Sequence, residues 1–188
     1  MPGITIILAW AINREKPGIL KTWGAVISLA GMLAIIAKGS FEVLSEFKFN
    51  PGDVLIILAI LSWAIYSVLL RKKEMDIHPV SLLTVLIIMG SLCIFPFYLW
   101  EYKVFGGFEF TPTIFFIFLF LGIFPSVLSY ISWNLGVKTA GSGSASIFMY
   151  LLPVFTSVIA FFFLGETLLT YHILGGILIL TGLIISSV

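Results

Sequence analysis

The chain has 188 residues, of which 60% are hydrophobic and 10% are charged, and its formal net charge is +1. Soluble domains carry roughly 25% charged residues, so the composition excludes an ordinary soluble protein, and the near-neutral charge gives no electrostatic basis for binding nucleic acid. The single cysteine, Cys93, allows no intrachain disulfide. Lipid is the solvent that suits so apolar a chain.

The first apolar segment, residues 4–12, contains about nine residues. A helix that crosses a bilayer needs about 20 residues, so this segment is too short to span. It resembles the second half of a helix whose first half is not in this sequence. We therefore expect an N-terminal half-helix.

Six further apolar segments are long enough to cross a bilayer. They do not show the strict alternation of a membrane β-barrel, so they are predicted to be helices. The predicted fold is an all-α, polytopic membrane helical bundle with six full transmembrane helices, at residues 20–38, 54–71, 79–100, 112–136, 144–164 and 170–188.

The two ends of the sequence resemble each other at an offset of 151 residues, without a gap. This alignment pairs identical residues along its length: Pro2 with Pro153, Thr5 with Thr156, Ala9 with Ala160, Glu15 with Glu166, Gly24 with Gly175, Leu29 with Leu180 and Gly31 with Gly182. We interpret it as an internal repeat. Residues 1–50 are then the C-terminal remnant of a first repeat, and residues 51–188 are the second repeat.

The repeat implies a longer parent protein. About 100 residues lie between Gly52 and Pro153 in the second copy, and the first copy has no counterpart to them. The expected parent has about ten helices in two five-helix repeats. Because five is odd, the repeats should be inverted relative to each other in the membrane.

Glu15 and Glu166 occupy the same turn in the two copies, between two apolar segments. Each is expected to be a structural turn residue. Its carboxylate would be stabilised by the positive end of the dipole at the N-terminus of the next helix. The alternative is that they bind an ion or a substrate. Inversion predicts that the two residues lie on opposite membrane faces.

Loop charges predict the orientation, because cytoplasmic loops are richer in Lys and Arg. One set of loops carries seven such residues and the other carries three: Arg14, Lys16, Lys21, Arg71, Lys72, Lys73 and Lys138 against Lys38, Lys48 and Lys103. The protein is therefore predicted to be a multi-pass protein of the cell membrane with its C-terminus in the cytoplasm.

These features together resemble the EamA family of the drug/metabolite transporter superfamily. The resemblance lies in GDVLIILAILSWAIYSVLLRK, in SVLSYISWNLGVKTAGSGSASIFMYLLP and in the Pro, Leu-Gly-Glu and Gly-rich pattern of PVFTSVIAFFFLGETLLTYHILGGILILTG. It implies two five-helix repeats and transport of amino acids, other metabolites or toxic compounds. NREK at residues 13–16 departs from the family's usual Leu-Gly-Glu.

No Asp, Glu, Lys, Arg or His lies in the interior of a predicted helix, away from the ends of the span. Such residues within a membrane are the usual functional candidates, and neither a catalytic nor a metal-ligand constellation is present. We therefore expect a protein that is not an enzyme and that uses no cofactor and no metal.

Uncharged polar side chains remain as candidates for a substrate path. Ser126, Ser129, Tyr130 and Trp133 follow helical spacing along one face. The complete set of path candidates is Trp63, Tyr66, Ser67, Ser126, Ser129, Tyr130, Trp133, Asn134 and Tyr150. The alternative is that these residues pack helices together, which we favour for the small residues of the run AGSGSAS, residues 140–146.

Pro125 and Pro153 are candidate hinges, because a proline inside a span removes a backbone hydrogen bond and permits a kink.

The predicted function is secondary transport of a small organic solute by alternating access. The alternative is a truncated or partner-dependent membrane subunit without transport activity of its own. The expected partners are the lipid bilayer and a small solute, with a homodimer or a partner chain supplying the missing helices, and no nucleic acid. A seven-helix photoreceptor is disfavoured, since the last span has no Lys for a retinal Schiff base.

Overall fold

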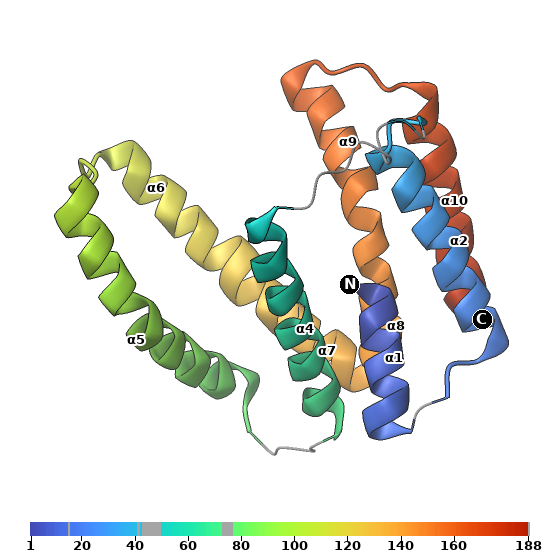
Figure 1. The fold of residues 1–188 in the computed structure, drawn as a ribbon, viewed down its shortest axis with the longest axis horizontal. Helices are drawn as coiled ribbons and strands as arrows, with labels where there is room; N and C mark the ends of the chain where they lie inside the picture. Colours follow the sequence, from blue (N-terminus) through green and yellow to red (C-terminus); the bar gives the residue numbers. More distant parts are fainter. Residues whose placement is uncertain (15, 41, 43–49, 73–76, 188) are drawn as a thin grey trace. The chain divides into compact units, whose positions relative to one another are not determined.

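The computed structural model describes residues 1–14, 16–40, 42, 50–72 and 77–187 (Figure 1). Within these residues, six helical segments are long and apolar enough to cross a membrane, as predicted: Ile19–Ile36, Pro51–Arg71, Pro79–Phe105, Pro112–Ala140, Ser142–Leu164 and Thr170–Ser187. The short apolar segment is the helix α1, Pro2–Asn13. The prediction of a polytopic helical bundle is confirmed.

Proline and glycine set many of the helix limits. Proline occupies the first turn of α1, of α4 (Pro51–Lys72), of α5 (Pro79–Phe105) and of α6 (Pro112–Leu121), where its missing N–H costs no hydrogen bond. Before α6, the Thr111 hydroxyl accepts a hydrogen bond from the Ile114 amide at 3.3 Å. After α5 and α9 (Leu152–Leu164), Gly106 and Gly165 turn the chain with φ values of 78° and 68°.

Two spans are interrupted at or beside a proline. Between α6 and α7 (Ser129–Ala140) lies a π-helix, η1, at Gly122–Leu128, with Pro125 inside it. Between α8 (Ser142–Ile147) and α9 lies a 3₁₀ turn, η2, at Phe148–Leu151, and Pro153 follows in the first turn of α9. Proline cannot donate the regular helical hydrogen bond, which accounts for a change of helix type at these points.

The chain divides into two compact units, which we describe separately. The first comprises Met1–Lys73 and Gly136–Val188, and the second comprises Glu74–Leu135. In the first unit α1 packs against α4 and α8, and α2 (Ile19–Ile36) packs against α10 (Thr170–Ser187). The second unit contains α5, α6, η1 and the start of α7.

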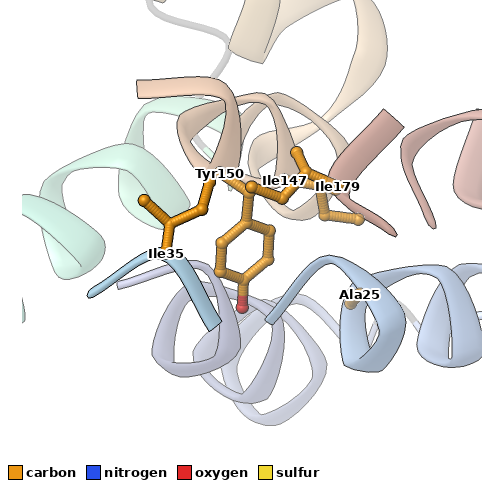
Figure 2. Close-up of a cluster of buried hydrophobic side chains, with 5 residues drawn as sticks. All are labelled: Ala25, Ile35, Ile147, Tyr150 and Ile179. Atoms are coloured by element: carbon orange, nitrogen blue, oxygen red, sulfur yellow. The ribbon is translucent and has the colours of Figure 1, made fainter. Parts of the chain in front are cut away.

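The hydrophobic core of the first unit surrounds the ring of Tyr150, as Figure 2 shows. Tyr150 is 2% exposed, and Ile147 and Ile179 are equally enclosed. α2 contributes Ala25 and Ile35 to this cluster. Side chains from α2, α8, η2 and α10 therefore meet in one core, which joins the N-terminal and C-terminal parts of the chain.

Glycines let α2 and α10 approach until their backbones touch. A Cβ placed on Gly24 would collide with the Gly182 carbonyl oxygen, and one on Gly31 would lie 2.6 Å from the Gly175 carbonyl oxygen. Between these two contacts the Ser28 hydroxyl donates a hydrogen bond to the Ile179 carbonyl at 3.2 Å. As residue numbers rise along α2 they fall along α10, so the two helices are antiparallel.

The contacts between α2 and α10 have the form expected of a two-fold axis. At the repeat offset of 151 residues, Gly24 corresponds to Gly175 and Gly31 to Gly182, and each glycine of one helix meets the non-equivalent glycine of the other. Ser28 and Ile179 are each other's equivalents, and they contact each other. Self-complementary contacts of this kind are the signature of an isologous interface.

The turns after α1 and α9 also correspond. Arg14 ends α1 with φ 57° and ψ 23°, and its equivalent, Gly165, ends α9 with φ 68° and ψ 19°. Both are left-handed C-cap residues, a conformation that glycine adopts most readily. The same backbone turn therefore occurs twice, although the residue differs.

Antiparallel packing places the beginning of α2 beside the end of α10. Gly18, before α2, and Gly165, before α10, therefore lie at opposite ends of this helix pair.

Glu166 follows Gly165 in the loop, and its amide donates to the Ala160 carbonyl at 3.3 Å. It lies four residues before the start of α10, and the Nδ1 atom of His172 accepts a hydrogen bond from the Leu169 amide at that helix start. Glu15 lies outside the described residues.

Candidate functional site

The polar stripe, defined as Ser126, Ser129, Tyr130 and Trp133, begins in the π-helix and continues into α7. All four residues belong to the second unit. The Ser129 hydroxyl donates to the Phe124 carbonyl at 3.1 Å, and the Ser129 amide donates to the same oxygen. The stripe thus starts where the helix departs from the regular hydrogen-bond pattern.

A π-helical turn carries more residues per turn than an α-helix and is frequent at functional sites. Here the irregular turn contains Pro125 and Ser126, and Ser129 follows it directly as the first residue of α7. Membrane helices tolerate such a turn where side chains can satisfy the displaced carbonyls, and the Ser129 hydroxyl does so for Phe124. Structural irregularity and polarity therefore coincide in this span.

Burial differs among the residues of this span. Ser126, Tyr130 and Trp133 are half-buried, Ser129 is exposed, and Asn134 is 1% exposed. The apolar side chains earlier in the span are open to the surroundings, with 48%, 49% and 46% exposure for Phe115, Phe118 and Leu119. The first part of the span therefore presents apolar side chains that suit lipid, and the polar side chains lie in the π-helix and in the part that follows it.

A second group of path candidates lies on α4 in the first unit. The rings of Trp63 and Tyr66 are 5.6 Å apart between centroids, with planes inclined by 44°. The Ser67 hydroxyl is fully buried and donates to the Trp63 carbonyl at 2.9 Å. These three residues share one face of α4, as their spacing predicts. Tyr150, the remaining candidate in this unit, lies in the hydrophobic core (Figure 2).

The run AGSGSAS forms a helix contact. Ser142 and Ser146 are fully buried in α8, which packs on α1 and α4. The Ser146 hydroxyl donates to the Gly143 carbonyl at 2.8 Å. Small side chains allow such close approach between membrane helices, and this placement supports the packing interpretation.

The candidate side chains supply hydroxyl, amide and aromatic groups. In the ranges that the structure describes, no group of three or more His, Cys, Asp or Glu side chains could hold a metal ion. Uncharged donors and acceptors orient a solute by hydrogen bonds, and aromatic faces attract flat or cationic groups. These groups can hold a solute by reversible binding.

Comparison with known proteins identifies the family of the chain. A family model described as the EamA-like transporter family matches residues 50–188.

The chain belongs to the EamA-like transporter family.

Two relatives of this EamA-like chain illustrate the match. An uncharacterized transporter, YyaM, of Bacillus subtilis (strain 168) is 28% identical over 186 residues, covering 99% of this chain and 61% of the relative. An uncharacterized transporter of Archaeoglobus fulgidus is 30% identical over 185 residues, covering 96% of this chain and 62% of the relative. The chain therefore spans less than two thirds of these relatives. No solved structure matches it.

Family membership and the six apolar helices identify a multi-pass membrane protein that belongs to a transporter family. The EamA resemblance noted in the sequence is confirmed over residues 50–188.

Side-chain bonds at one end of the first unit were not predicted from the sequence. The Lys21 ammonium donates to the Ser144 hydroxyl at 2.6 Å and joins α2 to α8. The Asn13 amide donates to the Val68 carbonyl at 3.3 Å, and the Arg71 guanidinium donates to the Lys138 carbonyl. Sequence reasoning used the cationic residues only as indicators of orientation. Their hydrogen bonds depend on which helix ends meet, and the spacing of the residues gives no signal for that.

Proposed function

We propose that the protein is a secondary transporter of small organic solutes, and that its polar stripe faces the solute path. The observation that carries this proposal is the coincidence of the stripe with the π-helix around Pro125. Interrupted helices at polar positions are where transporters of inverted-repeat design bind their substrates and move. Trp63, Tyr66, Ser67 and Asn134 are further candidates for the path, while the buried position of Tyr150 favours packing.

Alternating access requires two similar halves that rock against each other. The self-complementary contacts between α2 and α10 support an inverted repeat, because residues at the 151-residue offset exchange partners across that interface. We propose that residues 1–50 are the end of the first repeat and residues 51–188 the second. In this proposal Pro125 and Pro153 permit the movements, and the interface between α2 and α10 stays closed.

We further propose that the protein lies in the cell membrane with its C-terminus in the cytoplasm. The support is the excess of Lys and Arg in one set of loops. Gly18 and Gly165 lie at opposite ends of the antiparallel pair, so the two turns of the repeat would face opposite sides.

Thiol labelling tests the solute path. Cys93, which is exposed, is first replaced by Ala. Single cysteines are then introduced at Ser129 and at Phe118 in the full-length protein. A membrane-impermeant maleimide should label position 129 from at least one side of the membrane and leave position 118 unlabelled, because maleimide reacts with thiolate in water and a thiol facing hydrocarbon stays protonated.

Phe118 is the matched control because it lies in the same span and is 49% exposed in the isolated chain. Labelling of both positions to the same extent, or of neither, would return the stripe to a packing role. Transport by the same variants checks that each protein is folded. The substrate-path assignment depends on the difference between the two positions.

The second candidate function is a membrane subunit that acts only together with further helices. The observation that favours it is the contrast between α1 and α9, which correspond in the repeat. Thr5 is fully buried where α1 packs on α4 and α8, whereas its equivalent, Thr156, is exposed. By the repeat, α9 should be covered by helices equivalent to α4 and α8.

Reconstitution distinguishes the two functions. The purified 188-residue chain in liposomes is expected to insert but to give no uptake above that of empty liposomes. Radiolabelled amino acids and an organic cation, tetraphenylphosphonium, serve as probes, and a full-length relative serves as the positive control. Uptake by the chain alone would contradict the need for further helices.

A further inference from the structure

Helix α5 is longer than a bilayer core requires. It runs from Pro79 to Phe105, 27 residues, which corresponds to about 40 Å at a rise of about 1.5 Å per residue. The hydrocarbon core is about 30 Å thick. The last turns carry Tyr98, Trp100 and Tyr102, the residue types that concentrate at the membrane interface. This end of α5 therefore reaches the head-group layer.

A pocket of about 320 Å³ lies at this end, within the second unit. Its formation depends on a sharp turn after the helix. Gly106 has φ 78°, and its amide donates to the Tyr102 carbonyl at 3.0 Å. The chain then folds back so closely that a Cβ on Gly107 would lie 2.5 Å from the Tyr102 ring. The lining residues are Tyr98, Glu101, Tyr102, Phe105, Gly106, Gly107 and Phe108.

The lining has the electrostatics of a cation site. Glu101 is the only residue among the seven with an acidic side chain, and none of the seven is Lys, Arg or His. The rings of Tyr98 and Tyr102 are 6.1 Å apart between centroids. The face of an aromatic ring is negative and attracts ammonium groups. The two tyrosine rings and the Glu101 carboxylate therefore both attract a cation. Both tyrosine hydroxyls are also hydrogen-bond donors that suit a phosphate oxygen.

We propose that this pocket binds the head group of a zwitterionic phospholipid, with the ethanolamine or choline nitrogen facing Glu101 and the aromatic rings. The position of the pocket at head-group depth selects a lipid over a free amine, because the acyl chains of a lipid can remain in the hydrocarbon beside α5. Phosphatidylglycerol carries the same phosphate charge but no ammonium group, so its head group offers Glu101 no cation and is negative overall. The site is independent of the solute path.

Native mass spectrometry of the purified chain in detergent tests the proposal. Phosphatidylethanolamine and phosphatidylglycerol with identical acyl chains are added at equal concentration. Phosphatidylethanolamine adducts are expected to exceed phosphatidylglycerol adducts several-fold. Glu101→Gln should remove most of this preference, and Tyr102→Leu should weaken binding of phosphatidylethanolamine about fivefold or more. Tyr102→Phe should retain much of the binding because it keeps the ring.

Glu109→Gln is the matched control, since it makes the same charge change in the loop beyond the pocket lining. It should leave the lipid preference unchanged. Equal binding of the two lipids, or the same loss in Glu101→Gln and Glu109→Gln, would overturn the site. Soluble phosphoethanolamine provides a separate arm: displacement of the lipid at equal concentration would show that a free amine is the occupant and overturn the lipid assignment. Circular dichroism and elution volume verify that each variant is folded.

Discussion

Gly24→Ala is expected to lower the free energy of unfolding by about 2–3 kcal/mol, near the upper end of the usual cost of overpacking. The new methyl group would collide with the Gly182 carbonyl oxygen and lie 2.6 Å from the Ser186 amide nitrogen. Both obstacles are backbone atoms of α10, so no side-chain rotation relieves the contact. Gly182→Ala should act similarly, because its Cβ would lie 2.6 Å from the Ser28 amide nitrogen.

Gly90→Ala is the control for this experiment. Gly90 lies within α5, and a Cβ there has no heavy atom within 4 Å. Alanine favours a helix over glycine by up to about 1 kcal/mol, so this variant should be as stable as the parent or slightly more stable. Unfolding in mixed micelles of dodecyl maltoside and sodium dodecyl sulfate, followed by circular dichroism, measures both. Equal stability of the Gly24 and Gly90 variants would disprove the close contact between α2 and α10.

Thr5→Leu is expected to destabilise the chain by about 1–3 kcal/mol, whereas Thr156→Leu should change its stability by no more than about 0.5 kcal/mol. The two threonines correspond in the repeat. Thr5 is fully buried in α1, the helix that packs on α4 and α8, so a larger side chain there must displace its neighbours. Thr156 is exposed, and a leucine at that position meets lipid.

The same pair of variants tests the proposed repeat in a longer protein. Where helices equivalent to α4 and α8 are present, Thr156→Leu should become about as harmful as Thr5→Leu. The measurement is the same micellar unfolding assay, with and without the additional helices. If Thr156→Leu remained harmless in the full-length protein, α9 would not be the covered counterpart of α1.

Helix positions and lengths were predictable because the bilayer imposes a long apolar run on every span. All six predicted spans and the short first helix are present in the described residues. The helices begin and end at residues that favour those positions in any protein. Pro79 and Pro112 lie at helix starts, and Gly165 lies at a helix end. The interruption near Pro125 was predictable for the same reason, since proline lacks the N–H that an α-helix requires.

The polar stripe was predictable only as one face of a helix. Helical spacing predicts that one face carries the four residues Ser126, Ser129, Tyr130 and Trp133. It does not predict whether that face contacts another helix, lipid or water. Tyr150 illustrates the difference, because an equally polar tyrosine in a neighbouring span lies in a hydrophobic core beside Ile147 and Ile179. Whether a tyrosine faces a path or a core depends on the helices around it.

The sequence by itself determined the class of the protein, its spans and the 151-residue offset at which its two ends match, because apolar length and residue spacing can be read along a linear chain. Only the tertiary structure decided that Gly24 meets Gly182 while Gly31 meets Gly175, since that pairing requires two antiparallel helices. It likewise decided the pocket at Glu101, where a turn at Gly106 brings Gly107 onto the Tyr102 ring. Contacts between distant residues follow from helix orientation and backbone proximity, which residue order alone does not specify.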